Sequence, residues 1–206
     1  MDPHQHFASL FRAEGDLERR RAKFLSRVFG IFSEEIVRIW AAHSACPYED
    51  LGRPTARRTG LQGFSTLDFM LRHRTSGECF ATELKCEVEY ENFRYLTLTD
   101  IKQLDHHKKP AFIALLDLAK GLPGTDVQVA KRPVRCDGAI LIWGAASDAG
   151  KAATKVAFGF REVLTVAEMV HDLREWQEPA FHQHLIERET WFAELASGLR
   201  MGRGSP

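Results

Sequence analysis

Three residues near the middle of the chain have the types and spacing of a site for metal-assisted phosphate chemistry. Asp68 lies in the segment STLDFML, and Glu83 and Lys85 lie in FATELKCE. Because side chains alternate along a strand, Glu83 and Lys85 project from the same face. A turn at Thr75–Gly77 would bring Asp68 beside them. A hard cation such as Mg²⁺ takes one or two carboxylates together with water and phosphate oxygens, and a nearby lysine can orient the attacking water.

Two strands are expected to position these residues. Segments 63–74 and 78–90 each alternate across two faces, and Thr75-Ser76-Gly77 between them is a turn signal. The pattern therefore predicts a β-hairpin that carries Asp68 on its first strand, and Glu83 and Lys85 on its second.

Helical periodicity precedes the hairpin. Residues 16–45 place apolar side chains close to a period of 3.6, with a break at Gly30 and a restart capped by Ser33. The segment 46–60 contains two prolines, two glycines and three arginines, and we expect a loop there.

After the hairpin we expect a helix over 99–109, capped by Thr97 or Thr99 and ended by Pro110. The remaining elements are expected in the following order: a buried strand over 111–119, a mostly loop segment over 121–135, strands over 137–144 and 154–163, a helix from the capping box of Thr165 and Glu168, and a helix from Pro179 that Gly198 ends. Strands flanked by helices predict an α/β architecture with a mixed sheet.

Composition bounds the class of protein. The chain has 206 residues, with 28 Lys and Arg against 28 Asp and Glu, which predicts one domain over residues 1–206 and excludes a globally basic nucleic-acid coat. Four cysteines without a CxxC pair argue against a zinc ribbon or a disulfide framework. No secretory signal and no membrane-length apolar run are found. We therefore expect a cytoplasmic protein without a membrane partner.

The hairpin residues resemble a known signature. Asp68, followed by Glu83-Leu84-Lys85, is similar to the motif of the PD-(D/E)xK nuclease superfamily, with Leu67 in place of the usual proline. The resemblance implies a restriction-endonuclease-like αβββαβ core, a mixed central sheet flanked by helices. It places that core at about 31–118, with additional strands at 134–163 and C-terminal helices at 165–198.

The resemblance also implies a chemistry, which is Mg²⁺-dependent hydrolysis of phosphodiester bonds, with Mn²⁺ as a substitute. Asp68, Glu83 and the backbone carbonyl of Leu84 would bind the metal, and Lys85 would orient the nucleophilic water.

Two residues outside the hairpin extend the match. Glu35, on the apolar stripe of the preceding helix, would bind the water or a second metal, and Glu34 is the poorer candidate. Gln103 resembles a glutamine of RecB-like members and would position Lys85 or the scissile phosphate. Those members often add a tyrosine where His107 stands here. We expect His106 and His107 themselves to lie on the surface.

Basic and aromatic residues could contact the substrate, most simply DNA. The candidates for phosphate contact are Arg53, Arg57, Arg58, Arg72 and Arg74. The alternative for each is a solvated or ion-paired side chain. Tyr90, Phe93 and Tyr95 could stack on an unpaired base or pack as a loop anchor.

Two functions remain open from the sequence. The first is a nuclease acting in defence or repair, restrained by a partner subunit or an oligomeric state. The second is a catalytically silent nucleic-acid-binding or scaffold subunit of a larger complex. The apolar stripes of the C-terminal helices suit either the core or a homodimer seam.

Overall fold

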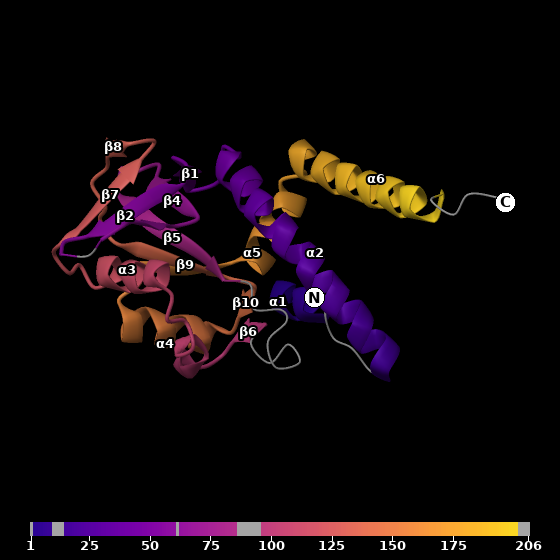
Figure 1. Ribbon diagram of the computed structural model, residues 1–206, viewed down its shortest axis with the longest axis horizontal. Helices are drawn as coiled ribbons and strands as arrows, with labels where there is room; N and C mark the ends of the chain where they lie inside the picture. The colour runs from indigo at the N-terminus through magenta and orange to yellow at the C-terminus, as the bar shows by residue number, and fades with distance from the viewer. Residues whose placement is uncertain (1, 10–14, 61, 86–95, 202–206) are drawn as a thin grey trace.

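The computed structural model describes residues 2–9, 15–60, 62–85 and 96–201, and its main element is a mixed five-stranded sheet with helices on both faces (Figure 1). The strands are neighbours in chain order. The second strand is antiparallel to the first and third, and the last two are parallel to the third. In that order the strands are β1 (Tyr48–Asp50), β4 (Phe69–His73), β5 (Cys79–Lys85), β9 (Ala139–Trp143) and β11 (Glu162–Thr165).

The predicted hairpin is confirmed as β4 and β5, but its first strand begins one residue after Asp68, and Ser65–Thr66 of the predicted strand form β3 in another sheet. Phe69 pairs with Thr82 and Arg72 pairs with Cys79, and Gly77 in the connecting turn has φ of +74°, which a side chain rarely tolerates. The strand expected over 137–144 is β9, whose five residues are all buried. A continuous apolar run is typical of a central strand covered on both faces.

Helices of different parts of the chain cover the two faces. Ile36, Val37 and Trp40 of α2 pack on one face together with α1 and α5. Phe112 and Leu115 of α3 pack on the other face, and α4 also lies on this side (Figure 1). The helices are α1 (Pro3–Ser9), α2 (Gly15–Ala42), the 3-10 helix η1 (Ile101–Leu104), α3 (Pro110–Ala119), α4 (Asp148–Phe158), α5 (Val166–Glu175) and α6 (Pro179–Met201).

A second sheet lies on the far side of α3. Ala56, Leu67 and Val127 from this sheet pack in one cluster with α3 and with the inner residues of β5 and β9, so α3 is held between the two sheets. The second sheet has the order β3 (Ser65–Thr66), β2 (Pro54–Arg58), β7 (Thr125–Val129) and β8 (Arg132–Pro133), and a separate parallel pair joins β6 (Thr97–Leu98) to β10 (Ala145–Ala146).

The predicted break in the first helix is wrong. α2 continues through Gly30, and the Ser33 hydroxyl donates to the Gly30 carbonyl at 3.1 Å within the helix instead of capping a new one. The expected loop over 46–60 contains β1 and β2. These strands were missed because they are short and expose arginine and acidic side chains on one face.

The prediction for Pro110 is also wrong. Pro110 begins α3 as its first residue, and residues 111–119 are helical instead of a strand. Proline is well suited to that position because its missing N–H would have no partner there. η1 is a single turn capped by Asp100. Of the helix expected over 99–109, only the single turn of η1 is therefore formed.

Two further segments differ from prediction. The first half of residues 154–163 belongs to α4, which begins where the Ser147 hydroxyl accepts from the Gly150 amide, and only the end of the segment reaches β11. The segment 121–135 contains β7 and β8.

The C-terminal helices follow the sequence closely. The predicted start of α5 is confirmed, because the Thr165 hydroxyl accepts from the Glu168 amide. Pro179 begins α6 as predicted, but the helix passes through Gly198. Residues 86–90 of the predicted second strand, with Tyr90, Phe93 and Tyr95, lie outside the described residues. Within the described residues, no helix combines the length and apolarity needed to cross a membrane.

Candidate active site

The start of the β4–β5 hairpin brings Asp68 to Glu83 and Lys85. Asp68 directly precedes β4, and its amide donates to the Thr82 carbonyl at 3.2 Å. Its carboxylate oxygen Oδ2 accepts from the Leu84 amide at 2.8 Å. These two bonds fix the Asp68 side chain beside the end of β5, where Glu83 and Lys85 lie.

Glu83 is a nearly buried acid with one oxygen paired. Its side chain lies in the central strand of the sheet and the residue is 6% exposed. Oε1 accepts from Lys85 Nζ at 2.5 Å. Oε2 is buried and has no hydrogen-bond partner among the described residues. A buried unpaired carboxylate oxygen is costly, so this atom marks a place where a ligand would be stabilising.

The electrostatics of the two carboxyls agree with that reading. Burial raises the pKa of Glu83 and the charge of Asp68 adds to the rise, while Lys85 and the backbone amide of Asp68 oppose it. Burial likewise raises the pKa of Asp68, while the Leu84 amide and the charges of Lys85 and Arg53 oppose the rise. Each acid is therefore harder to ionise than in water, and a cation between them would favour the charged forms of both.

The residues fit a hard divalent cation. Mg²⁺ binds through one or two carboxylates and keeps several water ligands, and this cluster offers Asp68 Oδ1 and Glu83 Oε2. In the part of the chain that the structure describes, no group of three or more His, Cys, Asp or Glu side chains is arranged to hold a metal. A two-carboxylate site meets the magnesium requirement without a third such side chain.

α2 contributes a carboxylate, but its placement differs from the sequence expectation. The charge of Glu34 raises the pKa of Asp68, whereas the charge of Glu35 acts on His184 of α6. Arg38 joins the two acids, with Nη2 3.3 Å from Glu34 and Nη1 3.4 Å from Glu35. Glu34 is therefore the acid of α2 whose charge acts on the cluster.

Gln103 is engaged in local structure. Its side-chain oxygen accepts from the amides of Thr99 and Asp100 at 2.6 and 2.8 Å, and its nitrogen donates to the Thr97 carbonyl at 3.1 Å. Together with Asp100 it forms a capping box around η1. These bonds give Gln103 the role of organising residues 97–103, and none of them reaches Lys85.

The predicted arginines separate into two groups. Arg53 lies at the cluster, with Nη2 3.6 Å from Asp68 Oδ1. It is held there because the neighbouring carbonyls of Gly52 and Pro54 accept from the amides of Met70 and Leu67. Arg57 is exposed on β2.

The other three arginines are paired. Arg58 contacts Asp117 of α3 at 2.8 Å. Arg72 pairs with Glu49. Arg74 donates to the backbone carbonyls of Ala41, Cys46 and Tyr48 at 2.9, 3.0 and 3.1 Å. Arg72 and Arg74 stand at the turn end of the hairpin, away from Asp68, and Arg74 ties the end of α2 to β1.

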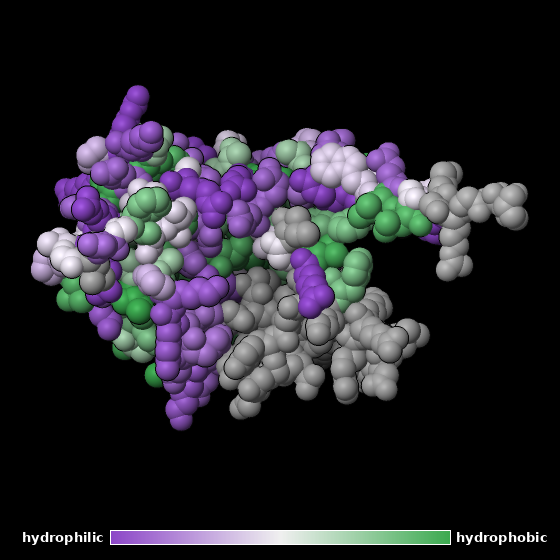
Figure 2. All heavy atoms as spheres, viewed as in Figure 1, coloured by the Kyte–Doolittle hydropathy of each residue, from purple (hydrophilic) through white to green (hydrophobic). Residues whose placement is uncertain are grey.

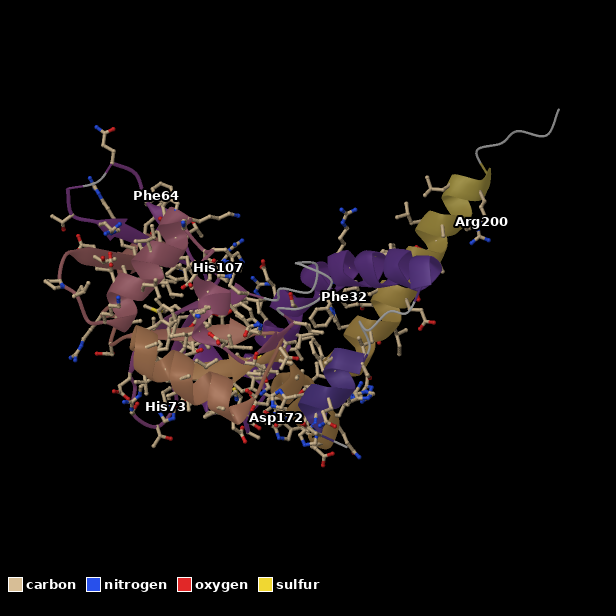
Figure 3. All side chains as sticks on the ribbon, turned by 90° about the horizontal axis from the view of Figure 1, so that it is seen from below. Phe32, Phe64, His73, His107, Asp172 and Arg200 are labelled. Carbon is tan, nitrogen blue, oxygen red and sulfur yellow. The ribbon has the colours of Figure 1, made fainter. Side chains whose placement is uncertain are left out.

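His107 lies near the site, which the sequence did not indicate. Its ring lies 4.9 Å from that of Phe112 and 6.0 Å from that of Trp143, and Trp143 pairs in register with Lys85. Burial, together with the charges of His106, Lys85 and Lys109, lowers the pKa of His107 to about 4. The prediction of a surface residue is wrong for His107, and the central position of His107 is visible in Figure 3. The one sequence signal for it was its spacing from Gln103.

A separate cavity of about 770 Å³ lies between the end of α3 and β7, lined in part by Leu118, Asp126 and Cys136. It contains none of Asp68, Glu83 and Lys85. The carboxylate cluster instead lies on the central strand β5 and at the start of β4.

Comparison of the chain with models of protein families, with curated proteins and with solved structures gave no significant match. The case for a function therefore depends on the site itself.

Proposed function

We propose that this chain is a Mg²⁺-dependent nuclease of the PD-(D/E)xK type that hydrolyses phosphodiester bonds, with DNA as the substrate. The observation that carries the proposal is the pair of half-buried Asp68 and buried Glu83 beside Lys85, with Glu83 Oε2 lacking a hydrogen-bond partner among the described residues. An acidic pair of this kind is destabilising unless it is matched by a cation, which is typical of a functional site.

The order of elements around the cluster supports the proposal. Along the chain, α2, β1, β4, β5, α3 and β9 follow the order helix, three strands, helix and strand that the resemblance implies. β2 and β3 are an insertion between the first and second of these strands. The metal ligands would then come from the second and third strands of the series, as the motif requires.

Each residue has a role that its contacts allow. Asp68 Oδ1 and Glu83 Oε2 would hold the metal, which supplies Lewis-acid polarisation of the phosphate and stabilises its developing negative charge. Lys85 Nζ has three N–H donors, and one of them donates to Glu83 Oε1. The others are available to hold the attacking water and a phosphate oxygen. Arg53, beside Asp68, would contact the neighbouring phosphate.

The charge balance favours a partner for substrate capture. The chain has no net charge, and Arg58, Arg72 and Arg74 are occupied by protein partners. Phosphate contacts from free cations supply most of the affinity of a non-specific nucleic-acid binder. The absence of net charge is equally consistent with the second candidate function, a catalytically silent binding subunit. Only a measurement of DNA cleavage distinguishes the two functions.

The test is cleavage of labelled linear and circular DNA by the purified protein with Mg²⁺, Mn²⁺ or EDTA. We expect metal-dependent cutting that Glu83→Gln and Lys85→Ala each lower by at least about a hundredfold, since each removes a group that acts in the transition state. The matched controls are Glu162→Gln and Lys155→Ala, which break an exposed ion pair of similar length, 2.9 Å, on β11 and α4.

Cutting that survives Glu83→Gln would contradict the proposal. If the wild type cuts nothing, isothermal titration with Mg²⁺ decides the matter. Mg²⁺ binding that Glu83→Gln abolishes would retain the assignment of the metal site in an enzyme that needs an activator, and absence of that binding would leave the silent subunit.

A further inference from the structure

The outer face of the second sheet carries a group of polar and aromatic side chains that the candidate active site does not use. They surround a shallow cavity of about 400 Å³ and we call them the outer patch: Thr55, Arg57, Phe64, Asp126, Gln128 and Lys131. The opposite face of the same strands is buried against α3 through Ala56 and Val127. The outer patch is therefore the solvent side of a sheet whose other side is core.

Strand register arranges the patch in rows. Thr55 of β2 pairs with Thr66 of β3 and with Gln128 of β7. One row further, Arg57 pairs with Asp126, and the antiparallel register of β2 and β3 places Phe64 on its other side. Arg57 thus stands between an aromatic ring and one acid on the same face.

The chemistry of the patch suits a polyanion with exposed rings. Phe64 is 73% exposed, and Figure 3 places it at the end of the molecule opposite Arg200 of α6. Arg57 and Lys131 are exposed, and the side chain of neither makes an ion pair or a hydrogen bond with the described residues. Lys131 is held with φ of +65° in the turn between β7 and β8. An exposed aromatic ring can stack on a base, and two free cations can contact phosphates.

The patch continues to the carboxylate cluster. The ladder of β2 and β3 extends past its last paired strand residues, because the Leu67 amide donates to the Pro54 carbonyl at 3.0 Å. The next row is Arg53 and Asp68, whose side chains lie 3.6 Å apart. Successive rows on one face are two residues apart, so the row of Arg57 and Phe64 lies about 13 Å from the row of Arg53 and Asp68.

We infer that the outer patch binds an unpaired nucleic-acid strand and leads it to the carboxylate cluster. Phe64 stacks on a base, Arg57 and Lys131 contact phosphates, and Arg53 contacts the phosphate at the cluster. An unpaired strand is favoured over a duplex because the bases of a duplex are stacked on one another and present no free face to Phe64. This inference rests on the proposed function and specifies its substrate.

Binding is measured without turnover, by fluorescence anisotropy in EDTA with a labelled single strand, the same strand as a duplex, and its RNA counterpart. We expect the single strand to bind more tightly than the duplex. Phe64→Ala should weaken single-strand binding at least about fivefold. Arg57→Ala and Lys131→Ala should each lower the slope of log affinity against log salt by about 0.7. The RNA arm tells whether the patch distinguishes the two sugars.

The matched controls lie on α6, far from the patch. Trp191→Ala removes a 52% exposed aromatic ring and Arg200→Ala an exposed cation, and both should bind as the wild type does. Single-strand binding unchanged by Phe64→Ala and by Arg57→Ala would overturn the inference, as would equal loss on the duplex or no single-strand binding at all. Patch-dependent binding by a protein that neither cuts DNA with metal nor binds Mg²⁺ through Glu83 would instead overturn the proposed function and leave the role of the patch intact.

Discussion

The Lys85 ammonium donates to one oxygen of Glu83, Oε1, at 2.5 Å, while the other oxygen of the same carboxylate, Oε2, is buried without a hydrogen-bond partner among the described residues. Only one of the two oxygens of the Glu83 carboxylate therefore has a hydrogen-bond donor among the described residues. Asp68 lies beside it and is half-buried, so the pair carries more negative charge than Lys85 alone balances.

Mg²⁺ should stabilise the folded chain through these two carboxylates. A ligand that binds the folded state alone, at a hundred times its dissociation constant, adds about 2.7 kcal/mol to the free energy of unfolding. Thermal unfolding with and without Mg²⁺ should show an upward shift for the wild type, and none for Glu83→Gln or Asp68→Asn. Glu162→Gln, the control, should shift as the wild type does. A shift of equal size in all variants would contradict the assignment.

The same two acids should make stability in EDTA depend on pH. The pKa of Asp68 is raised above 3.8 and that of Glu83 above 4.5, so the folded state binds their protons more tightly than the unfolded state does. Their contribution to stability is complete below those ordinary values and is lost as the pH rises through the raised ones. In urea unfolding from pH 4 to 8, the free energy of unfolding of Glu83→Gln should therefore exceed that of the wild type by an amount that grows with pH. Parallel curves would contradict this.

Gln103 should prove to be a structural residue. Gln103→Ala removes four hydrogen bonds to Thr97, Thr99 and Asp100, and we expect it to lower the free energy of unfolding by about 1–3 kcal/mol. Asp100→Ala removes the other half of the same capping box and serves as the matched variant. Where both variants are folded, DNA cleavage should stay within about tenfold of the wild type. A hundredfold loss in Gln103→Ala alone would make Gln103 part of the catalytic machinery.

Arg74 should contribute to stability and leave nucleic-acid affinity unchanged. Its guanidinium donates to three backbone carbonyls at the junction of α2 and β1, and a lysine cannot reproduce that geometry. We expect Arg74→Lys to lower the free energy of unfolding by about 1–3 kcal/mol. The matched Arg72→Lys, in an exposed ion pair with Glu49, should cost less than about 1 kcal/mol. Urea unfolding and anisotropy with labelled DNA check both statements. A loss of affinity in Arg74→Lys would restore its predicted role in phosphate contact.

The hairpin and the strand β9 could be predicted from sequence because their patterns are local. β4 and β5 alternate with a period of two around a glycine turn, and β9 is an uninterrupted apolar run. The mixed α/β class followed from these elements and the terminal helices. Residues 111–119 were mistaken for a strand because a short apolar run after a proline fits both a buried strand and a helix that begins at the proline.

For the candidate site, the sequence could predict only which side chains of one strand share a face, because side chains alternate along a strand. Alternation predicts that Glu83 and Lys85 share a face. The choice between Glu34 and Glu35 depends on how α2 crosses the sheet, and that crossing is set by distant contacts such as Trp40 Nε1 with Asp172 at 2.9 Å. The backbone partners of Arg74 lie within residues 41–48, which are 26 to 33 residues earlier in the chain, so no local pattern could indicate them.

α6 remains a largely unpartnered element of the described structure. Phe32 of α2 stacks against its Phe192, with ring centroids 6.3 Å apart, while Trp191, Leu195 and Leu199 are exposed. Figure 2 shows hydrophobic side chains along this projecting helix. The homodimer seam expected from the sequence stays a prediction, which sedimentation of the purified chain would check.

The five strands of the main sheet pair in the order in which they occur along the chain. During translation, the first three strands leave the ribosome early and can pair with their neighbours through short connections. β9, which protects the other edge of β5, is made only after α3 and the strands β7 and β8. Until β9 has left the ribosome and paired with β5, the strand that carries Glu83 has an open edge, so the carboxylate cluster can be completed only after that step.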